Sequence, residues 1–325
     1  MPTVPIGVAL IGTGGVAQMH ANALREVSGA HLIGAFSRSP ENVTRFSDQF
    51  ETRGYRALDE LLSDPQVEVV SVLTPVANHV EMAWTCLQAG KHVLVEKPVG
   101  RTAEEIRTLT TAAAKAGRLC VPMHNYIYSP AIQRAKQLID QGKLGRLSSL
   151  WMIYNQKHDA DMGWPDLLLR ELHIHHAYVT LFLAGRPIRV GGLASNIHFS
   201  DTSAPDQAMV LCELPGGAVA NLWGSFGVDD RTSNPWSVYY KVLGTEGGFT
   251  HSWDDCYSGD AKLPGWDKTG YRDSFLHVYD HFFNRCLANG DPPLSGLDDA
   301  VDALRIIEAT EAAVEQRTFV DVDYA

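Results

Sequence analysis

The sequence predicts an α/β protein of two domains, the first built on a parallel sheet and the second an α+β domain with a mostly antiparallel open sheet. Residues 4–123 alternate short apolar runs with amphipathic helical patterns, which is typical of successive β-α-β units. Residues 147–243 instead hold strand-like runs that a single helical pattern interrupts. We therefore expect domains at 1–123 and 124–325, and we expect the C-terminal helix to pack back on the first domain.

In the first domain the helix signals lie between the apolar runs. Thr102 and Glu105 form a capping box that opens a helix, and Gly117 closes that helix. Gly90 ends a helix that begins near Asn78. The expected strands are 4–11, 31–37, 67–73, 91–95 and 118–123.

In the second domain Ser129 and Pro130 supply the N-cap and first-turn proline of a helix that Gly142 ends. Pro-Gly-Gly at 215–217 joins two strands as a tight antiparallel hairpin. The expected strands are 147–155, 188–199, 207–214, 218–226 and 238–243, and the further helices are 166–184, 275–289 and 297–315.

The composition describes a folded, enzyme-sized chain with an acidic balance. Its 325 residues carry a net charge of −11, which gives no electrostatic signature for nucleic acid or an anionic membrane. No apolar run approaches the roughly 18 residues of a membrane span. The five cysteines are scattered without a C-x-x-C pair, which indicates free thiols in a reducing compartment. A small neutral or weakly charged ligand and a cytoplasmic location are therefore expected.

A glycine-rich turn, IGTGGVA at residues 11–17, follows the first predicted strand and opens a helix. Gly12 allows the tight turn, Gly14 lets the backbone approach a pyrophosphate, and Ala17 permits close packing of the helix on the strand. Gly15 and Val16 complete the helix N-terminus that would hold the phosphates. The turn therefore predicts a Rossmann dinucleotide-binding domain, with a glycine turn of another α/β domain as the alternative.

The second predicted strand ends without the acidic residue that binds the ribose hydroxyls in NAD-binding domains. Ser37 and Arg38 stand at that position instead. A guanidinium suits a 2′-phosphate as a charge partner and as a flat hydrogen-bonding face. We therefore expect NADP to be preferred, with NAD possible and a solvated surface arginine as the alternative interpretation of Arg38.

Charged residues directly follow the apolar run of KHVLVEKPVG, residues 91–100. Glu96 and Lys97 thus fall at the C-terminal edge of a parallel strand, which is where open α/β sheets bind ligands. A surface ion pair is the alternative, but such a pair has no need of Pro98 to rigidify the segment.

Four segments together resemble the glucose–fructose oxidoreductase / inositol dehydrogenase (Gfo/Idh/MocA) family. They are the glycine turn, TPVANHVEMA at 74–83, AGKHVLVEKPVG at 89–100 and SPAIQRAKQLIDQGKLGRL at 129–147, and the resemblance covers nearly the whole chain. It implies that Glu96 and Lys97 face the nicotinamide end of the cofactor, next to a bond before Pro98 that is often cis. It also places three further residues at the cofactor site: Thr74, Pro75 and His79.

The segment RELHIHHAYVTLFLAGRP, residues 170–187, resembles the second catalytic element of this family, an Asp-x-Gly-x-His helix followed by a Gly-x-Pro turn. Counting back from Gly185 places His175 on the family histidine and Glu171 on the family aspartate. These two residues are four apart, so on a helix they share one face. The resemblance implies that His175 takes the hydroxyl proton, that Lys97 stabilises the developing alkoxide, and that Glu171 orients or tunes them.

The histidines of HIHH, residues 173–176, also suggest a metal site, which we do not favour. His173 and His175 point to different sides of a helix, and His173 and His176 lack an evident third ligand. No metal is therefore predicted.

The chain departs from the family pattern at some positions. Ile127 stands where arginine is common, Val76 replaces an asparagine, and Glu171 replaces the aspartate. Because of these changes, the resemblance does not identify the substrate. Aromatic faces stack well on sugar rings, which makes a few residues candidates for the substrate pocket, with a core or interface role as the alternative for each: His124, Tyr126, His158 and Trp164.

The sequence thus predicts an NADP-preferring dehydrogenase or reductase that acts on a secondary hydroxyl or carbonyl of a sugar, polyol or sugar derivative. A homodimer or homotetramer is expected, because proteins of this kind usually pair through the exposed face of the second sheet. Three alternatives stay open: glycosidic bond cleavage by transient oxidation with a tightly bound cofactor, reduction of an imine or non-sugar carbonyl, and a non-catalytic dinucleotide-responsive binding protein.

Overall fold

The computed structural model describes residues 5–158, 167–199, 204–228, 236–252 and 269–325. The chain divides into two units, which we describe separately. The first comprises residues 1–128 and 272–301, and the second comprises residues 129–271 and 302–325. The segment 272–301 therefore belongs with the N-terminal part of the chain.

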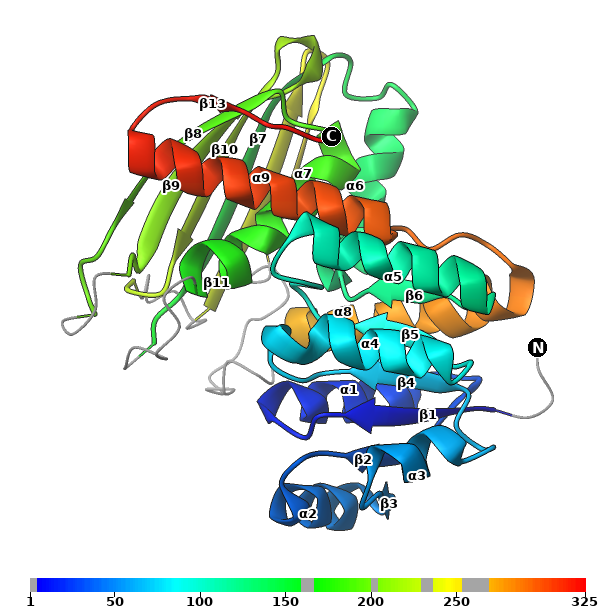
Figure 1. Cartoon of the computed structure of the whole chain (residues 1–325). Helices are drawn as coiled ribbons and strands as arrows, with labels where there is room; N and C mark the ends of the chain where they lie inside the picture. Colours follow the sequence, from blue (N-terminus) through cyan, green and yellow to red (C-terminus); the bar gives the residue numbers. More distant parts are fainter. Residues whose placement is uncertain (1–4, 159–166, 200–203, 229–235, 253–268) are drawn as a thin grey trace, which may run out of the picture. The chain divides into compact units, whose positions relative to one another are not determined.

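The described part of the first unit contains six parallel strands in the order β3-β2-β1-β4-β5-β6 (Figure 1). This confirms the Rossmann-type parallel sheet. The strand order reverses between β1 and β4, so the carboxyl ends of these two strands mark the position where such sheets bind ligands. The strands are β1 (Ile6–Ile11), β2 (Ala30–Phe36), β3 (Arg53–Gly54), β4 (Val69–Val72), β5 (His92–Val95) and β6 (Cys120–Pro122).

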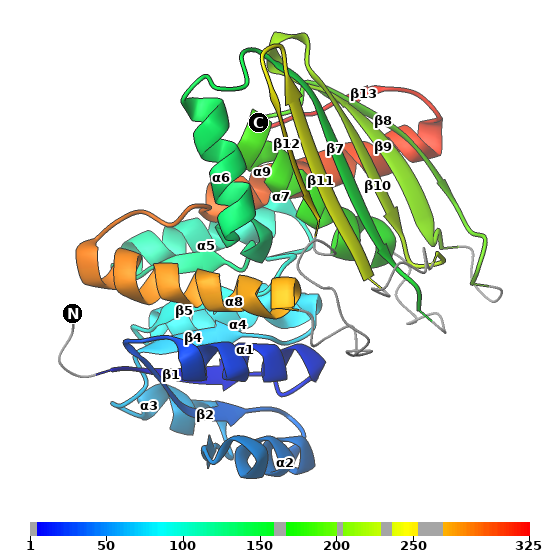
Figure 2. The same cartoon turned by 180° about the vertical axis from the view of Figure 1, so that it is seen from behind.

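Helices cover both faces of this sheet, which is why its central strands are mostly apolar. Figures 1 and 2 show α4 and α5 on one face and α1 and α8 on the other. The predicted ends of α5 are correct: the Thr102 hydroxyl accepts the Glu105 N–H at 3.2 Å, and Gly117 closes the helix at φ 62°. The helices are α1 (Gly15–Glu26), α2 (Pro40–Phe50), α3 (Leu58–Ser63), α4 (His79–Gln88), α5 (Ala103–Ala116), α8 (Thr269–His281), a π-helix (Phe282–Leu287) and two 3-10 turns (Val76–Asn78 and Asn125–Tyr128).

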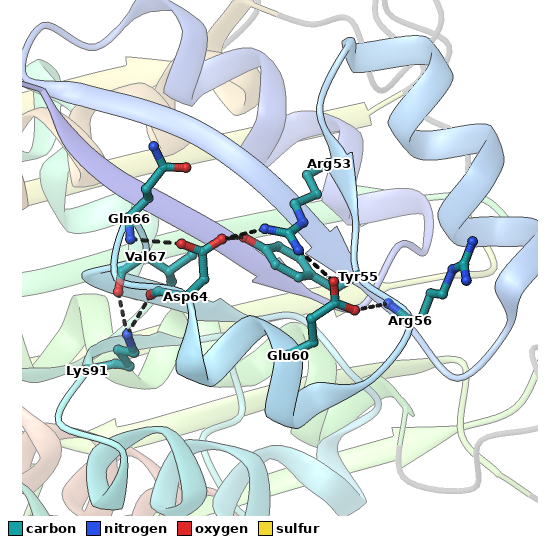
Figure 3. A network of polar contacts seen from close by, with 8 residues as sticks. All are labelled: Arg53, Tyr55, Arg56, Glu60, Asp64, Gln66, Val67 and Lys91. Atoms are coloured by element: carbon teal, nitrogen blue, oxygen red, sulfur yellow. Dashed lines mark hydrogen bonds and ion pairs between the residues drawn. The ribbon is translucent and has the colours of Figure 1, made fainter.

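A polar network centred on Asp64 ties the amino-terminal edge of this sheet together (Figure 3). One carboxylate oxygen of Asp64 accepts the Tyr55 hydroxyl and an Arg53 N–H, each at 2.8 Å, while the other accepts the Gln66 N–H at 2.8 Å. Lys91 donates to the carbonyl oxygens of Asp64 and Val67 at 3.1 and 2.6 Å. The Gln66 N–H outweighs the effect of burial and, with Tyr55, Arg53 and Lys91, lowers the pKa of Asp64. This network lies at the edge opposite the ligand-binding one, so we assign it to stability.

The second unit is built on a sheet with seven described strands in the order β12-β11-β7-β10-β9-β8-β13. Strands β7 and β10 pair in parallel and the other neighbours are antiparallel, which confirms the mostly antiparallel sheet. The predicted hairpin at 215–217 joins β9 to β10. The strands are β7 (Leu147–Gln156), β8 (Arg189–Ser195), β9 (Gln207–Glu213), β10 (Val219–Ser225), β11 (Trp236–Gly244), β12 (Gly248–Ser252) and β13 (Val320–Asp321).

Helices of the second unit lie on one side of this sheet (Figures 1 and 2). They are α6 (Pro130–Asp140), a π-helix (Leu167–His173), α7 (Ile174–Ala184) and the larger part of α9 (Leu297–Gln316). The side chains on the opposite side share one face, which we call the open face, and are 47–73% exposed: Trp151, Leu193, Met209, Leu211 and Val219.

The strand predicted at 188–199 is shorter in the structure and ends at Ser195. The buried Asp206 carboxylate accepts the backbone N–H groups of Ile197, His198 and Phe199 at 2.6–3.2 Å. These N–H groups are therefore not available to pair with a neighbouring strand, and the chain turns away from the sheet.

Candidate functional site

The glycine turn between β1 and α1 has the backbone shape that the sequence predicted. Gly12 has φ +109°, and a Cβ added there would lie 2.6 Å from the carbonyl oxygen of Leu73. A side chain at this position would therefore clash with the end of β4. Ala17 is fully buried, so α1 packs closely against the strand.

The N-terminus of α1 is shaped to accept an anion. Gly14 is the N-cap residue, and no described side chain caps the helix. A Cβ added to Gly14 or Gly15 would meet no described atom within 4 Å, and the first turn of α1, with the half-buried Val16, holds no acidic residue. The hydroxyls of Thr13 and Thr74 are buried and have no hydrogen-bond partner in the described part of the chain. These features fit the pyrophosphate of a dinucleotide.

The end of β2 carries an exposed cation. Arg38 is exposed, and within the described residues it forms no ion pair or hydrogen bond. The half-buried Ser37 beside it has its hydroxyl 3.5 Å from the Ser39 N–H, and Ser39 caps α2. The guanidinium therefore remains available at the end of β2.

Glu96 lies directly after β5 and is a buried, hydrogen-bonded carboxylate. It is 7% exposed; its Oε1 atom is 3.0 Å from His20 Nε2, and its Oε2 atom accepts the Lys97 N–H at 3.0 Å. Burial raises the pKa of this carboxyl, but the hydrogen bond from His20 and the nearby Lys97 and His79 outweigh burial and lower the pKa overall. Lys97 is half-buried, and its bond to Pro98 is cis, as the family resemblance implied.

His79 connects two loops at this edge of the sheet. Its Nδ1 atom is 2.8 Å from the Pro98 carbonyl oxygen, and its Nε2 atom is 2.5 Å from the Thr74 carbonyl oxygen. Both partners are acceptors, so a neutral ring donates to only one of them. His79 is buried, whereas Thr74 is half-buried and Pro75 exposed. The imidazole therefore holds the Thr74–Pro75 turn beside Pro98, and both of its nitrogens face protein carbonyls.

In the second unit His175 lies in the first turn of α7 and is 4% exposed. Its Nδ1 atom is 2.6 Å from the Tyr178 hydroxyl, and its ring also packs against Tyr154. If Nδ1 carries the proton and donates to Tyr178, then Nε2 holds the lone pair that a general base requires.

Glu171 lies in the π-helix that precedes α7 and is half-buried. The sequence predicted an uninterrupted α-helix here, with Glu171 and His175 on one face. A π-helical turn is wider than an α-helical turn, so that spacing rule does not hold across the junction. The neighbouring Arg170 anchors the π-helix through two hydrogen bonds of 2.7 Å to the Glu311 carboxylate of α9.

The residues predicted for a substrate pocket fall in different surroundings. His124 and Tyr126 are 1% and 2% exposed inside the first unit. Nδ1 of His124 is 2.7 Å from the Ser295 hydroxyl, and burial lowers the pKa of His124 to about 3, so its ring is neutral at pH 7. His158 is half-buried in the second unit, and Trp164 lies outside the described residues.

His173 and His176 pack against one another beneath the second sheet. Their ring centroids are 5.1 Å apart, and Nε2 of His176 is 3.1 Å from the Trp223 carbonyl oxygen. Burial is the main cause that lowers the pKa of both, to about 4 for His176 and well below the usual value for His173. The described residues contain no group of three or more metal-ligating side chains.

Sequence analysis missed a set of buried polar residues behind Glu96: His20, Ser71 and Tyr279. His20 occupies a position on the otherwise apolar stripe of Ala17, Ala21 and Leu24 in α1, which was the available signal. Tyr279 lies 259 residues further along the chain, and no local pattern connects it to His20.

A parallel sheet with a glycine-lined, uncapped helix N-terminus at its switch point defines a dinucleotide-binding α/β protein. Residues 6–124 match the family described as "Oxidoreductase family, NAD-binding Rossmann fold", and residues 132–250 match the "GFO/IDH/MocA C-terminal domain". The chain belongs to the Gfo/Idh/MocA family of oxidoreductases.

Named relatives align with nearly the whole chain. A 4-carboxy-2-hydroxymuconate-6-semialdehyde dehydrogenase of Sphingobium sp. is 23% identical, over 95% of this chain and 99% of its own length. A scyllo-inositol 2-dehydrogenase (NAD(+)) of Bacillus subtilis is 26% identical, over 94% and 93%. The crystal structure of GenD2 from gentamicin A biosynthesis, in complex with NAD, shares the fold with a TM-score of 0.87, 24% identity and coverage of 99% and 98%.

Two further observations bear on the surroundings of the protein. No helix among the described residues is long and apolar enough to cross a bilayer. Cys86, Cys120, Cys212 and Cys286 are buried free thiols. A cytoplasmic location stays a prediction.

The buried histidine pair predicts a loss of stability in mild acid. Unfolded histidines titrate near pH 6.5, whereas the pKa of folded His176 is about 4 and that of folded His173 is lowered well below its usual value. Below pH 6.5 the unfolded chain thus binds protons that the folded chain does not, so the free energy of unfolding falls as the pH drops toward about 4. The expected slope is up to about 1.4 kcal/mol per pH unit for each histidine. Urea unfolding between pH 7.5 and 5 measures it.

His176→Gln keeps a donor for the Trp223 carbonyl and should flatten this slope by about one proton, whereas the exposed control His31→Gln should not change it. An unaltered slope in the His176 variant would contradict the assignment. The carboxyls with lowered pKa, including Asp64 and Glu96, lose their stabilising effect only below about pH 4.5, outside this window.

Proposed function

We propose that the protein is an NAD(P)-dependent dehydrogenase or reductase that acts on a secondary hydroxyl or carbonyl of a sugar, polyol or sugar derivative. One observation carries the proposal. The glycine-lined N-terminus of α1, the Thr74 hydroxyl and the Glu96-Lys97-Pro98 segment follow β1, β4 and β5, which are neighbours in the sheet, so they share one edge. This edge combines an anion-binding cradle with an ammonium group.

The proposed chemistry assigns each side chain a limited task. A bound nicotinamide supplies the hydride acceptor or donor. The Lys97 ammonium stabilises the negative charge that develops on the substrate oxygen, and His175 takes or returns the hydroxyl proton. Tyr178 holds Nδ1 of His175 at 2.6 Å, which fixes the ring and favours Nε2 as the base. Glu171 would orient or tune the substrate and these two groups.

The substrate class rests on the family and on one relative in particular, which is named as acting on scyllo-inositol. A second candidate is a non-sugar carbonyl compound, because another relative aligned over nearly its full length is named for a semialdehyde substrate. The acid–base pair alone does not distinguish these substrates, since neither group specifies the ring around the reacting carbon.

The first prediction for this function concerns Lys97. Purified protein offered NAD⁺ or NADP⁺ with pools of polyols, sugars, sugar acids and semialdehydes should reduce the cofactor with one pool, measured by nicotinamide absorbance. Lys97→Ala should lower kcat by about a thousandfold or more, because it removes the charge on the reacting oxygen. Cofactor Kd should change less than about threefold, since the cradle at α1 is intact.

The control Lys115→Ala removes an exposed lysine at the end of α5 and should leave both constants unchanged. Full turnover by the Lys97 variant at saturating substrate would refute the role assigned to this lysine. Turnover with semialdehydes but with no sugar or polyol would favour the second candidate substrate.

The second prediction concerns cofactor choice, for which we propose a preference for NADP. Arg38→Ala should weaken NADPH binding by about 10- to 100-fold and leave NADH binding almost unchanged, because a charge-assisted contact with the 2′-phosphate is lost. Nicotinamide fluorescence titration measures both Kd values. Arg45→Ala, at an exposed arginine of α2 that bonds Asn42, is the matched control. Equal losses for the two cofactors, or none, would argue for NAD.

The third prediction concerns assembly. We propose that the open face pairs with a second copy of the chain in a homodimer or homotetramer, because exposed apolar side chains are gathered on it. The wild-type protein should sediment as a dimer or larger, and Leu193→Asp combined with Met209→Asp should shift it toward the monomer. Trp84→Asp, at an aromatic residue of α4 that is 47% exposed, should not. A wild-type monomer would refute this proposal.

A further inference from the structure

A chain of four buried polar groups connects four elements of the first unit. The Ser71 hydroxyl in β4 is 2.8 Å from the Tyr279 hydroxyl in α8, which is 2.7 Å from His20 Nδ1 in α1. His20 Nε2 is 3.0 Å from Glu96 Oε1 after β5. Ser71, His20 and Tyr279 are completely buried, and His20 also packs against Phe275.

One arrangement of donors runs along the whole chain toward Glu96. An ionised Glu96 only accepts, so the Lys97 N–H and His20 Nε2–H both donate to it. With that proton on Nε2, Nδ1 accepts from the Tyr279 hydroxyl, and the Tyr279 oxygen accepts from Ser71. In this arrangement every donor of the chain has an acceptor. The chain therefore ends on a carboxylate that contacts the backbone of the proposed catalytic lysine.

We propose that His20 and Tyr279 are positioning residues that act through Glu96: they keep its carboxylate ionised and aimed at the Lys97 N–H, and so hold Lys97 in place. This inference rests on the role proposed for Lys97.

The groups that face Glu96 support this inference. They come from three helices and from the segment of Glu96 itself: His20 from α1, Tyr279 from α8, His79 from α4, and Lys97. Burial favours the neutral acid, and the His20 hydrogen bond is the largest opposing influence. Without a donor at position 20, the pKa of Glu96 should therefore rise toward neutrality. A neutral Glu96 would no longer be an acceptor only, and it would leave the Lys97 ammonium without its buried counter-charge.

The test compares His20→Gln with His20→Leu, because neither side chain ionises and only glutamine retains an N–H donor for Glu96. The first readout needs no substrate: urea unfolding between pH 8 and 5. The leucine variant should gain stability relative to the glutamine variant as the pH falls, because its folded state takes up a proton on Glu96. Adding Glu96→Gln to both variants should abolish this pH-dependent difference in stability. If the two variants differ in their free energy of unfolding by the same amount at every pH, as a packing role alone would produce, the proposal is overturned.

The second readout is kcat against pH with whichever substrate is turned over. The leucine variant should lose about tenfold more of its kcat between pH 9 and pH 6 than the glutamine variant, since the general base His175 is present in both. If the leucine variant does not fold, Tyr279→Phe should move both readouts in the same direction by less, because it leaves the His20 tautomer unfixed. No change in Tyr279→Phe would then count against the proposal.

The two readouts separate the two hypotheses. A pH-dependent difference in stability between the two variants, without turnover on any substrate, would support the proposed role of His20 and Tyr279 and refute the proposed dehydrogenase function. Turnover with the same pH profile in both variants, and a stability difference that does not change with pH, would support the dehydrogenase function and refute the role of His20 and Tyr279.

Discussion

A buried, ionised carboxylate at the carboxyl edge of a parallel sheet is the constraint on which the first unit depends. Glu96 is held by a donor from α1 and by the N–H of the residue that follows it. A buried charge persists only with hydrogen-bond partners, which here requires α1 to lie beside the end of β5 and α8 to lie beside α1. The same α1 offers its uncapped N-terminus to an anion. One helix thus connects the proposed phosphate cradle to the acidic residue beside Lys97.

In the second unit, the irregular helical segment that carries His175 is anchored by side chains. Its sheet is covered on one side by helices, and the wider turns of the π-helix precede α7 at the point where His175 is placed. Two side-chain contacts fix this helical segment: Tyr178 with the His175 ring and Arg170 with Glu311. Irregular backbone is therefore anchored here by specific side-chain hydrogen bonds.

Much of this fold could be predicted from sequence because its signals are local. The glycine turn, the capping box at Thr102 and the proline at 130 each specify one backbone feature over a few residues. Two-residue strands such as β3 and β13 leave no periodic pattern, and β12 was missed as well. The π-helix replaced an expected α-helix, and Asp206 shortened β8 from a distance. Glu96 and Lys97 were predicted as site residues with the support of their position after a strand, but the contacts of His20 with Glu96 and Tyr279 lie in no window of sequence.

The discontinuity of the first unit has a consequence for how the protein is made. Residues 272–301 supply Tyr279 to His20, Ser274 to the Asn125 amide and Ser295 to His124. Until residue 301 has been synthesised, the six strands lack these partners, and the polar groups on α1 and after β6 lack these hydrogen bonds. Most of the second unit is therefore synthesised before the nucleotide-binding unit receives its last segment, even though β1 leaves the ribosome first.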